Sequence, residues 1–204
     1  MLPSLHRKIK ANQFKKREAA FAKYLQGAVD NEAFLPGTPA YARPAILQHY
    51  GINTKWLDVV DNIWVALWFA CHEARVLDRD KPYVHFVRRR RPYPDQSKPK
   101  HAYVFLIQAT DVEPQKETPG LWVSKEAEMI DLRIAAPSLY IRPHAQHGLL
   151  VKKRNNDDLA SSEFGPMVVG ILRVEIGDAL DWIGGGSLLS AHTLFPPPYH
   201  DFGY

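Results

Sequence analysis

Residues 48–70 constrain the fold of this chain more than any other stretch, because the pattern changes there from strand-like to helix-like. Residues 54–60 are β-branched and apolar apart from one acid, Asp58, which predicts a short buried strand. A helix follows, and either Asp61 or Asn62 is suited to cap it. Apolar residues occupy every face of that helix, so we expect it to be buried. Asp58 should therefore lie at the edge of a core, where a carboxylate requires a partner.

Composition limits the class of protein. The 204 residues suffice for one domain with a substantial core, and a hydrophobic fraction of 46% argues against disorder. The formal charge of +4 permits an anionic partner without requiring one. Cys71 is the single cysteine, so no disulfide framework exists, and we expect a cytoplasmic protein. No apolar run is long enough to span a membrane.

Hydrophobic periodicity predicts a single α+β domain with a mixed, mostly antiparallel sheet and helices around it. We expect a basic helix over residues 4–26 and a short helix from Ala45. A further helix is predicted over residues 125–134, and two short helices near the C-terminus. Strands are predicted at residues 83–87 and 102–108, which we expect to pair, and at 121–124, 139–142, 148–151 and 168–176.

A set of polar side chains interrupts segments that are otherwise apolar. An unpaired buried polar group costs about 1–3 kcal/mol, and a domain of this size has about 5–15 kcal/mol of stability. We therefore expect these groups to converge on one concave site, with Asp58 at least half buried and accepting hydrogen bonds. The cluster is either a buried network, for example Asp58 with Arg142, or a ligand site. Its members are Gln48, His49, Tyr50, Asp58, Tyr140, Arg142 and Gln146.

A basic loop and a histidine pair are two further candidates. The loop carries Arg88, Arg89, Arg90 and Arg91 before a proline-rich stretch. Four arginines can clamp phosphate, so nucleic-acid binding is one hypothesis and a solvated hairpin insertion is the other. His144 and His147 have the spacing of metal ligands. However, a proline and a glycine flank the pair and no third ligand is evident, so we predict no metal site.

The sequence QHYGINTKWLD followed by NIWVALWFA resembles the signature of the FRG domain, a bacterial family that usually reads QHYGLPTRLLDWT and then VALFFA. Two later pieces are also similar to that family, namely Arg142 with Gln146 and Gly148, and the tripeptide LFP at 194–196. The tripeptide Phe-Arg-Gly that names the family does not occur, and residues 1–5 resemble the segment that follows it. We therefore expect residues 1–204 to form an FRG-like domain without its Phe-Arg-Gly strand.

The FRG signature is distantly similar to mono-ADP-ribosyltransferases, in which a polar strand end precedes a helix of this type. That resemblance implies an ADP-ribosyltransferase-like fold with a cleft for NAD or another nucleotide. It places Asp58 where those enzymes have a Ser-Thr-Ser strand, and Gln146 near the late-strand glutamate that binds the nicotinamide ribose. It thereby implies catalytic roles for Asp58, Gln146 and His49, and ligand-binding roles for Gln48, Tyr50, Thr54, Tyr140 and Arg142.

These observations leave three hypotheses about function. The leading one is an FRG-domain protein that acts on NAD, as an ADP-ribosyltransferase or an NAD glycohydrolase, in a bacterial toxin or phage-defence setting. The alternative is a non-catalytic nucleic-acid or nucleotide-binding module that uses Arg88 to Arg91 and the basic first helix. The third is an interaction domain in which the polar cluster only stabilises the fold. The sequence does not indicate an oligomeric state.

Overall fold

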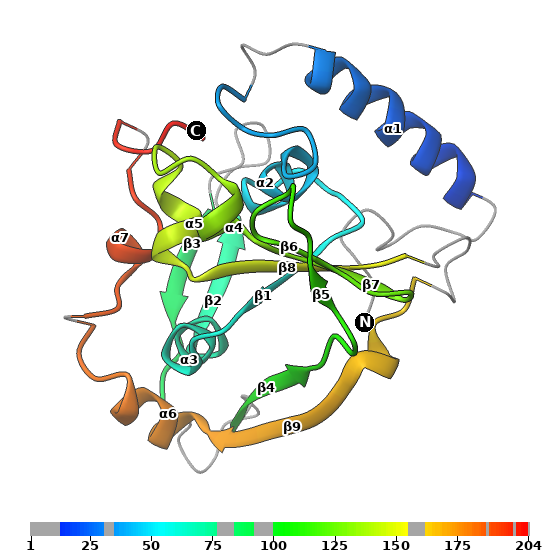
Figure 1. The fold of residues 1–204 in the computed structure, drawn as a ribbon. Helices are drawn as coiled ribbons and strands as arrows, with labels where there is room; N and C mark the ends of the chain where they lie inside the picture. Colours follow the sequence, from blue (N-terminus) through cyan, green and yellow to red (C-terminus); the bar gives the residue numbers. More distant parts are fainter. Residues whose placement is uncertain are drawn as a thin grey trace.

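The computed structural model describes residues 13–30, 35–76, 84–91, 100–154, 162–186, 188–197 and 199–203. Helices and strands alternate along these residues, and Figure 1 shows their arrangement. The elements are α1 Phe14–Asp30, α2 Arg43–His49, β1 Leu57–Val60, α3 Ile63–Cys71, β2 His72–Val76, β3 Val84–Arg88, β4 His101–Ile107, β5 Glu113–Pro114, β6 Leu121–Val123, β7 Ala127–Asp131, α4 Leu132–Ala135, α5 Ile141–Ala145, β8 Gly148–Lys153, β9 Val168–Glu175, α6 Ile176–Trp182 and α7 Ala191–Leu194.

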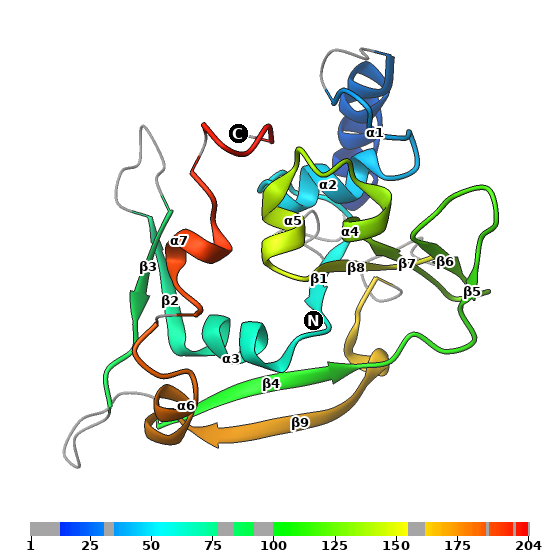
Figure 2. The same ribbon diagram turned by 60° about the vertical axis from the view of Figure 1, so that its left-hand side comes forward.

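Five strands form one antiparallel sheet in the order β1-β8-β7-β6-β5, with β1 at an edge. The helices α2, α4 and α5 lie together on one face of this sheet (Figures 1 and 2). Between these helices and the sheet, Ile46 of α2 and Leu132 of α4 share a core cluster with Leu150 of β8. Leu150 is fully buried and lies opposite Asp58 in the β1–β8 register. This packing brings the C-terminal end of α2 beside β1.

Two antiparallel ribbons complete the fold, since β2 pairs with β3 and β4 pairs with β9. The helix α3 lies between the five-stranded sheet and the β4–β9 ribbon (Figure 2). Leu67 and Cys71 of α3 pack against β4, β9 and α6, whereas Trp68 packs with α7. Asn62 caps α3, because its side-chain oxygen accepts hydrogen bonds from the backbone N–H groups of the first turn.

The predicted fold class is confirmed as α+β with antiparallel sheets and several helices. The expectation of one mixed sheet is wrong for the described residues, because their strands form three sheets and every pair is antiparallel. In the ranges given above, no helix has both the length and the apolarity to cross a membrane.

Several predicted elements are corrected by long-range pairing. Residues 125–134 were predicted as one helix from their helix-forming side chains, but residues 127–131 form β7 because they pair with β8. Residues 139–142 do not form a strand, since α5 begins at Ile141. The predicted partners around residues 83–87 and 102–108 do not pair with each other: β3 pairs with β2, and β4 with β9. The predicted start of the first helix, Ser4, lies outside the described residues.

The helix α3 is less buried than its sequence predicts. Val65, Leu67, Trp68 and Cys71 are buried, but Ile63 and Trp64 are 44% and 48% exposed. The ribbons and the C-terminal elements cover the later turns of α3 and leave part of its first turn open. An apolar residue in the sequence therefore indicates a face suited to burial, but the tertiary arrangement decides whether a neighbour covers it.

Candidate functional site

Asp58 is the centre of the candidate site. It lies on the edge strand β1, and its side chain is 44% exposed, so somewhat more than half is buried as predicted. Its Oδ2 accepts a hydrogen bond from Nε2 of Gln48 at 2.7 Å, and its Oδ1 lies 3.2 Å from Nδ1 of His49. Both partners come from the last turn of α2. Asp58 therefore accepts hydrogen bonds from side chains at most ten residues away in sequence.

The orientation of Gln48 follows from its contact with Thr54. The side-chain oxygen of Gln48 accepts hydrogen bonds from the backbone N–H of Thr54 at 3.1 Å and from its hydroxyl at 2.9 Å. The amide nitrogen of Gln48 must then point to Asp58, where it donates. Thr54 is fully buried. In this structure Thr54 orients Gln48 and has no exposed surface, and its predicted ligand-binding role stays an untested prediction.

His49 connects Asp58 to the start of β8. Its side chain is buried, and a Cβ placed on Gly148 would lie only 3.0 Å from the Cε1 atom of His49. The ring therefore packs directly on the backbone of Gly148. Its Nε2 is buried and has no hydrogen-bond partner among the described residues. Nδ1 is therefore the ring nitrogen that contacts Asp58, and the buried ring orients the carboxylate.

The charge state of Asp58 follows from these contacts. Burial alone would raise the pKa of the Asp58 carboxyl. The hydrogen bonds from His49 and Gln48 and the positive charges of His49 and Arg142 outweigh burial, so the pKa lies below its ordinary value. Asp58 is therefore ionised at neutral pH. Its side chain is nevertheless 44% accessible to solvent.

Arg142 completes the site on the side of α5. Its guanidinium carbon lies 5.5 Å from the ring centre of Tyr50 and 4.7 Å from that of Phe195, so it packs between two aromatic rings. The hydroxyl of Tyr50 donates to Oδ1 of Asp201 at 2.5 Å, and the backbone N–H of Arg142 donates to Oδ2 at 2.9 Å. Asp201 is only 1% exposed. This carboxylate fixes both Tyr50 and the first turn of α5, and the sequence prediction missed it.

Two predicted site residues do not reach the site. Tyr140 is fully buried, its ring packs edge-on against Tyr50, and its hydroxyl lies 3.5 Å from the carbonyl of Pro36. Gln146 is 4% exposed, and its Nε2 donates to the carbonyl of Leu194 at 2.7 Å. The predicted ligand-binding role of Tyr140 and catalytic role of Gln146 stay untested predictions, and none of these contacts joins either residue to Asp58. Both residues satisfy buried polar groups of the fold.

Comparison with known proteins identifies part of the chain. Residues 1–79 match the FRG domain. This confirms the FRG resemblance predicted from the sequence. Gln48, His49 and Asp58 lie inside the matched stretch, whereas Arg142 and Asp201 lie outside it. No curated protein and no solved structure matches the chain.

A second polar network lies at the other end of β1 and spans the boundary of the FRG match. Arg133 binds both oxygens of Asp61 at 3.1 and 2.7 Å and both oxygens of Asp131 at 2.9 and 2.6 Å. His147 lies beside them, with Nδ1 3.3 Å from Oδ1 of Asp61. Burial alone would raise the pKa of Asp61, but Arg133 and His147 lower it on balance. The sequence prediction missed this network, because nothing local links residues 72 positions apart.

The arginine loop lies outside the FRG match, and two of its arginines bind other parts of the protein. Arg88 donates to the carbonyls of Leu180 and Gly184 at 3.1 and 2.9 Å, and Arg91 pairs with Asp181. These contacts place positive charge at the C-terminal end of α6, where it complements the helix dipole. Within the loop, the nucleic-acid hypothesis therefore retains Arg89 and Arg90, and together with the basic first helix it stays an untested prediction.

The sequence predicted no metal site at His144 and His147, which lie in α5 and just after it. The described residues contain no group of three or more metal-ligating side chains that could hold an ion. His147 contacts Asp61 and Arg133, as described above. Its φ angle of +52° is unusual for a residue other than glycine and turns the chain from α5 into β8.

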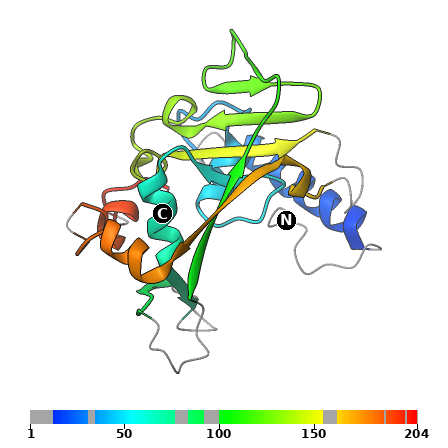
Figure 3. The same cartoon turned by 90° about the horizontal axis from the view of Figure 1, so that it is seen from below.

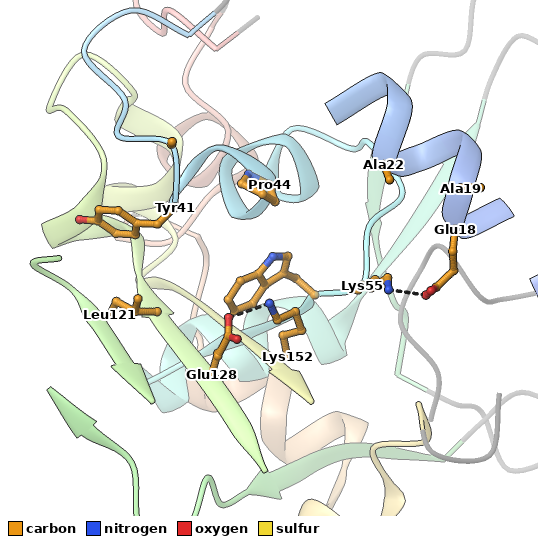
Figure 4. Close-up of a pocket in the computed structure, with 11 residues that line it drawn as sticks. Glu18, Ala19, Ala22, Tyr41, Pro44, Lys55, Leu121, Glu128 and Lys152 are labelled. Atoms are coloured by element: carbon orange, nitrogen blue, oxygen red, sulfur yellow. Dashed lines mark ion pairs between the residues drawn. The ribbon is translucent and has the colours of Figure 1, made fainter. Parts of the chain in front are cut away.

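A cavity of about 580 Å³ lies between α1, α2 and the five-stranded sheet (Figure 4). Lys55 pairs with Glu18 at 2.6 Å, and Lys152 pairs with Glu128 at 2.6 Å. Nζ of Lys152 also lies 4.9 Å from the ring centre of Trp56, which lines the same cavity. Glutamates therefore compensate the positive charge of both lysines in this cavity.

Proposed function

We propose that the site around Asp58 binds NAD or a related nucleotide and that this FRG-domain protein cleaves the nicotinamide–ribose bond, as an NAD glycohydrolase or an ADP-ribosyltransferase. One observation carries the proposal. The Asp58 carboxylate is ionised, held in one orientation by Gln48 and His49, and accessible to solvent on 44% of its side chain. These two contacts leave further lone pairs of the carboxylate, which can accept hydrogen bonds from a ligand.

The groups around Asp58 fit such a ligand. A carboxylate accepts hydrogen bonds from the two hydroxyls of a ribose, and a guanidinium binds phosphate. Asp58 keeps lone pairs beyond the two contacts that it receives, and Arg142 lies close enough for its charge to lower the pKa of Asp58. Tyr50 and Phe195 flank the guanidinium with aromatic rings. The set therefore matches the sugar–phosphate part of a nucleotide.

The chemistry requires little of the protein beyond this set. When the bond between ribose C1′ and nicotinamide breaks, the electron pair leaves with nicotinamide and positive charge develops on the ribose. The Asp58 carboxylate, which is ionised already, would stabilise that charge without a proton transfer. Water or another acceptor then adds to C1′ and releases a proton to solvent. The low pKa of Asp58 suits this electrostatic role and does not suit a general acid.

The biological setting that we propose is a bacterial toxin or phage-defence effector, in which cleavage would deplete NAD or modify a target. This part of the proposal follows from the FRG match over residues 1–79 and from the resemblance of its signature to mono-ADP-ribosyltransferases.

A nicotinamide-release assay with Asp58→Asn tests the proposal. This substitution keeps the size of the side chain and removes its charge. We expect the wild-type chain to bind NAD in calorimetry and to release nicotinamide, and the variant to lose about 100-fold or more of that rate. Asp111→Asn is the matched control, because Asp111 is an exposed turn residue with a φ of +54°, which asparagine tolerates.

The result that overturns the proposal is a wild-type chain that neither binds NAD nor releases nicotinamide. Equal rates for wild type and Asp58→Asn would overturn the role of Asp58 even if NAD were cleaved. Melting curves of both variants separate a lost activity from a lost fold.

A further inference from the structure

The β4–β9 ribbon exposes apolar side chains on its outer face. Tyr103 and Phe105 of β4 are 52% and 50% exposed, and Ile171 of β9, which lies opposite Phe105, is 58% exposed. Val169, which the register shift between Leu106 and Ile107 leaves without a partner in β4, is 63% exposed. Isolated exposed apolar residues are ordinary on protein surfaces, but a contiguous group of them marks an interaction surface.

The arrangement of the ribbon explains why this face is open. Alternate residues such as Ala102 and Val174 point to α3 and α6 and join a core cluster with them. Tyr103, Phe105 and Ile171 therefore point the other way. In Figure 2, α3 lies on one side of the ribbon and no labelled element lies on the other. Figure 3, seen from below, looks onto β4 and β9 in front of the molecule.

The edges of the ribbon also lack a further strand in the described part of the chain. Within the described residues, β4 pairs only with β9. Proteins commonly protect such edges with lysine or proline. Neither strand carries either residue, since β4 reads HAYVFLI and β9 reads VVGILRVE. A ribbon of this kind is therefore suited to contact another protein surface.

We propose that this outer face of the β4–β9 ribbon is the interface of a two-fold dimer of the chain. The exposed apolar area of this face is large enough for a second copy of the chain. Half-exposed aromatic side chains present about 75–125 Å² each, so the four apolar residues present about 400 Å². Two copies would contribute about 800 Å² of apolar surface, which is the apolar share of an interface of about 1,200 Å² in total. That size is the lower end of the standard range for specific complexes.

The charges on the same face are self-complementary. Arg173 lies opposite Tyr103 and Glu175 lies opposite His101, so both point outward with the apolar group. Both are exposed. A two-fold axis places one surface against its own copy, so Arg173 of one chain can meet Glu175 of the other, and the reverse contact follows by symmetry. One strand thus supplies both members of an intermolecular ion pair.

Sedimentation velocity of the chain, from low micromolar to about 100 µM, tests this proposal. We expect a concentration-dependent dimer of twice the chain's 23.2 kDa. Ile171→Lys should raise the dissociation constant about 100-fold, because each dimer would bury two unpaired ammonium groups. Ile134→Lys is the matched control, since Ile134 is 55% exposed but lies on α4. Circular dichroism melting of both variants checks that they are folded.

Charge reversal tests the two-fold arrangement itself. Arg173→Glu and Glu175→Arg should each weaken the dimer about tenfold, because each places like charges together. An equimolar mixture of the two variants should restore it, since the opposite charges then meet in a heterodimer. A wild-type chain that remains monomeric, alone or with another protein bound, overturns the proposal. So does a dimer that Ile171→Lys leaves unchanged, and failure of the mixture to recover overturns the two-fold contact.

Discussion

Asp58 and Asp61 are three residues apart and have almost the same exposure, 44% and 46% of the side chain. Burial alone would raise the pKa of each carboxyl, and in each case the partners outweigh burial and lower it. Their partners differ in kind. Asp61 receives both arms of the Arg133 guanidinium, whereas Asp58 receives the neutral amide of Gln48 and a histidine nitrogen.

The comparison shows that exposure and pKa do not separate a binding carboxylate from a structural one. The two carboxylates differ in what their partners can offer a ligand. The Arg133 guanidinium contacts both oxygens of Asp61 and is shared with Asp131, so it is committed to the fold. Asp58 is oriented by the neutral amide of Gln48, and the positive charges near it come from His49 and from Arg142, whose guanidinium can also bind a phosphate. Our proposal therefore places the ligand at Asp58 and gives Asp61 a structural role.

The largest expected effect separates these two aspartates directly. Asp58→Asn should reduce nicotinamide release about 100-fold or more with a small change in melting temperature, whereas Asp61→Asn should lower the melting temperature and retain most of the activity. Rates and melting curves measured on the same preparations give both readouts. Equal losses of activity in the two variants would contradict the contrast between the two sites.

The next prediction concerns Arg133, the cation that contacts Asp61 and Asp131. Arg133→Gln should reduce the free energy of unfolding by about 3 kcal/mol, because Asp131 is 5% exposed and would lose its charged partner. Urea denaturation measures this change. Arg75→Gln is the control, since Arg75 pairs with Glu73 on the exposed surface and its loss should leave the denaturation midpoint unchanged. A similar midpoint for both variants would show that the Arg133 network does not stabilise the fold.

A smaller effect should follow from moving His49 without touching Asp58. In Gly148→Ala the new Cβ would lie 3.0 Å from Cε1 of His49 and 3.2 Å from the carbonyl of Pro143, so the ring must shift. We expect about a tenfold decrease in the rate of nicotinamide release, because the shift misaligns the carboxylate. In Gly177→Ala nothing lies within 4 Å of the new Cβ, and the rate should not change. Unchanged activity in Gly148→Ala would show that the position of His49 does not matter.

The smallest effect is the dependence of stability on pH. The pKa of both Asp58 and Asp61 is lower in the folded protein than the ordinary value of about 4. Each carboxylate therefore stabilises the fold above that pH, and the contribution is lost as the pH falls through the folded pKa. The difference in unfolding free energy between wild type and either asparagine variant should shrink below about pH 4. A difference that stays constant down to pH 2 would contradict the direction of these pKa shifts.

The sequence alone predicted the part of the site whose contacts are local. Gln48, His49 and Thr54 all lie within ten residues of Asp58, and the strand, the cap and the helix that follow were predicted there. Contacts of this range depend on helix and strand geometry that short patterns encode. The FRG match covers the same part of the chain.

The tertiary structure decided the rest, because those contacts join distant residues. Tyr50 and Asp201 are 151 positions apart, and Arg133 and Asp61 are 72 apart. Whether a polar side chain faces solvent or a buried carbonyl also depends on the layer above it, as Gln146 illustrates by donating to the buried carbonyl of Leu194. The outer face of β4–β9 is a third case, since its apolar residues match a core strand in sequence and only their exposure in the described part of the chain reveals a surface. Local patterns specify what a residue can do, and long-range packing selects which of those contacts it makes.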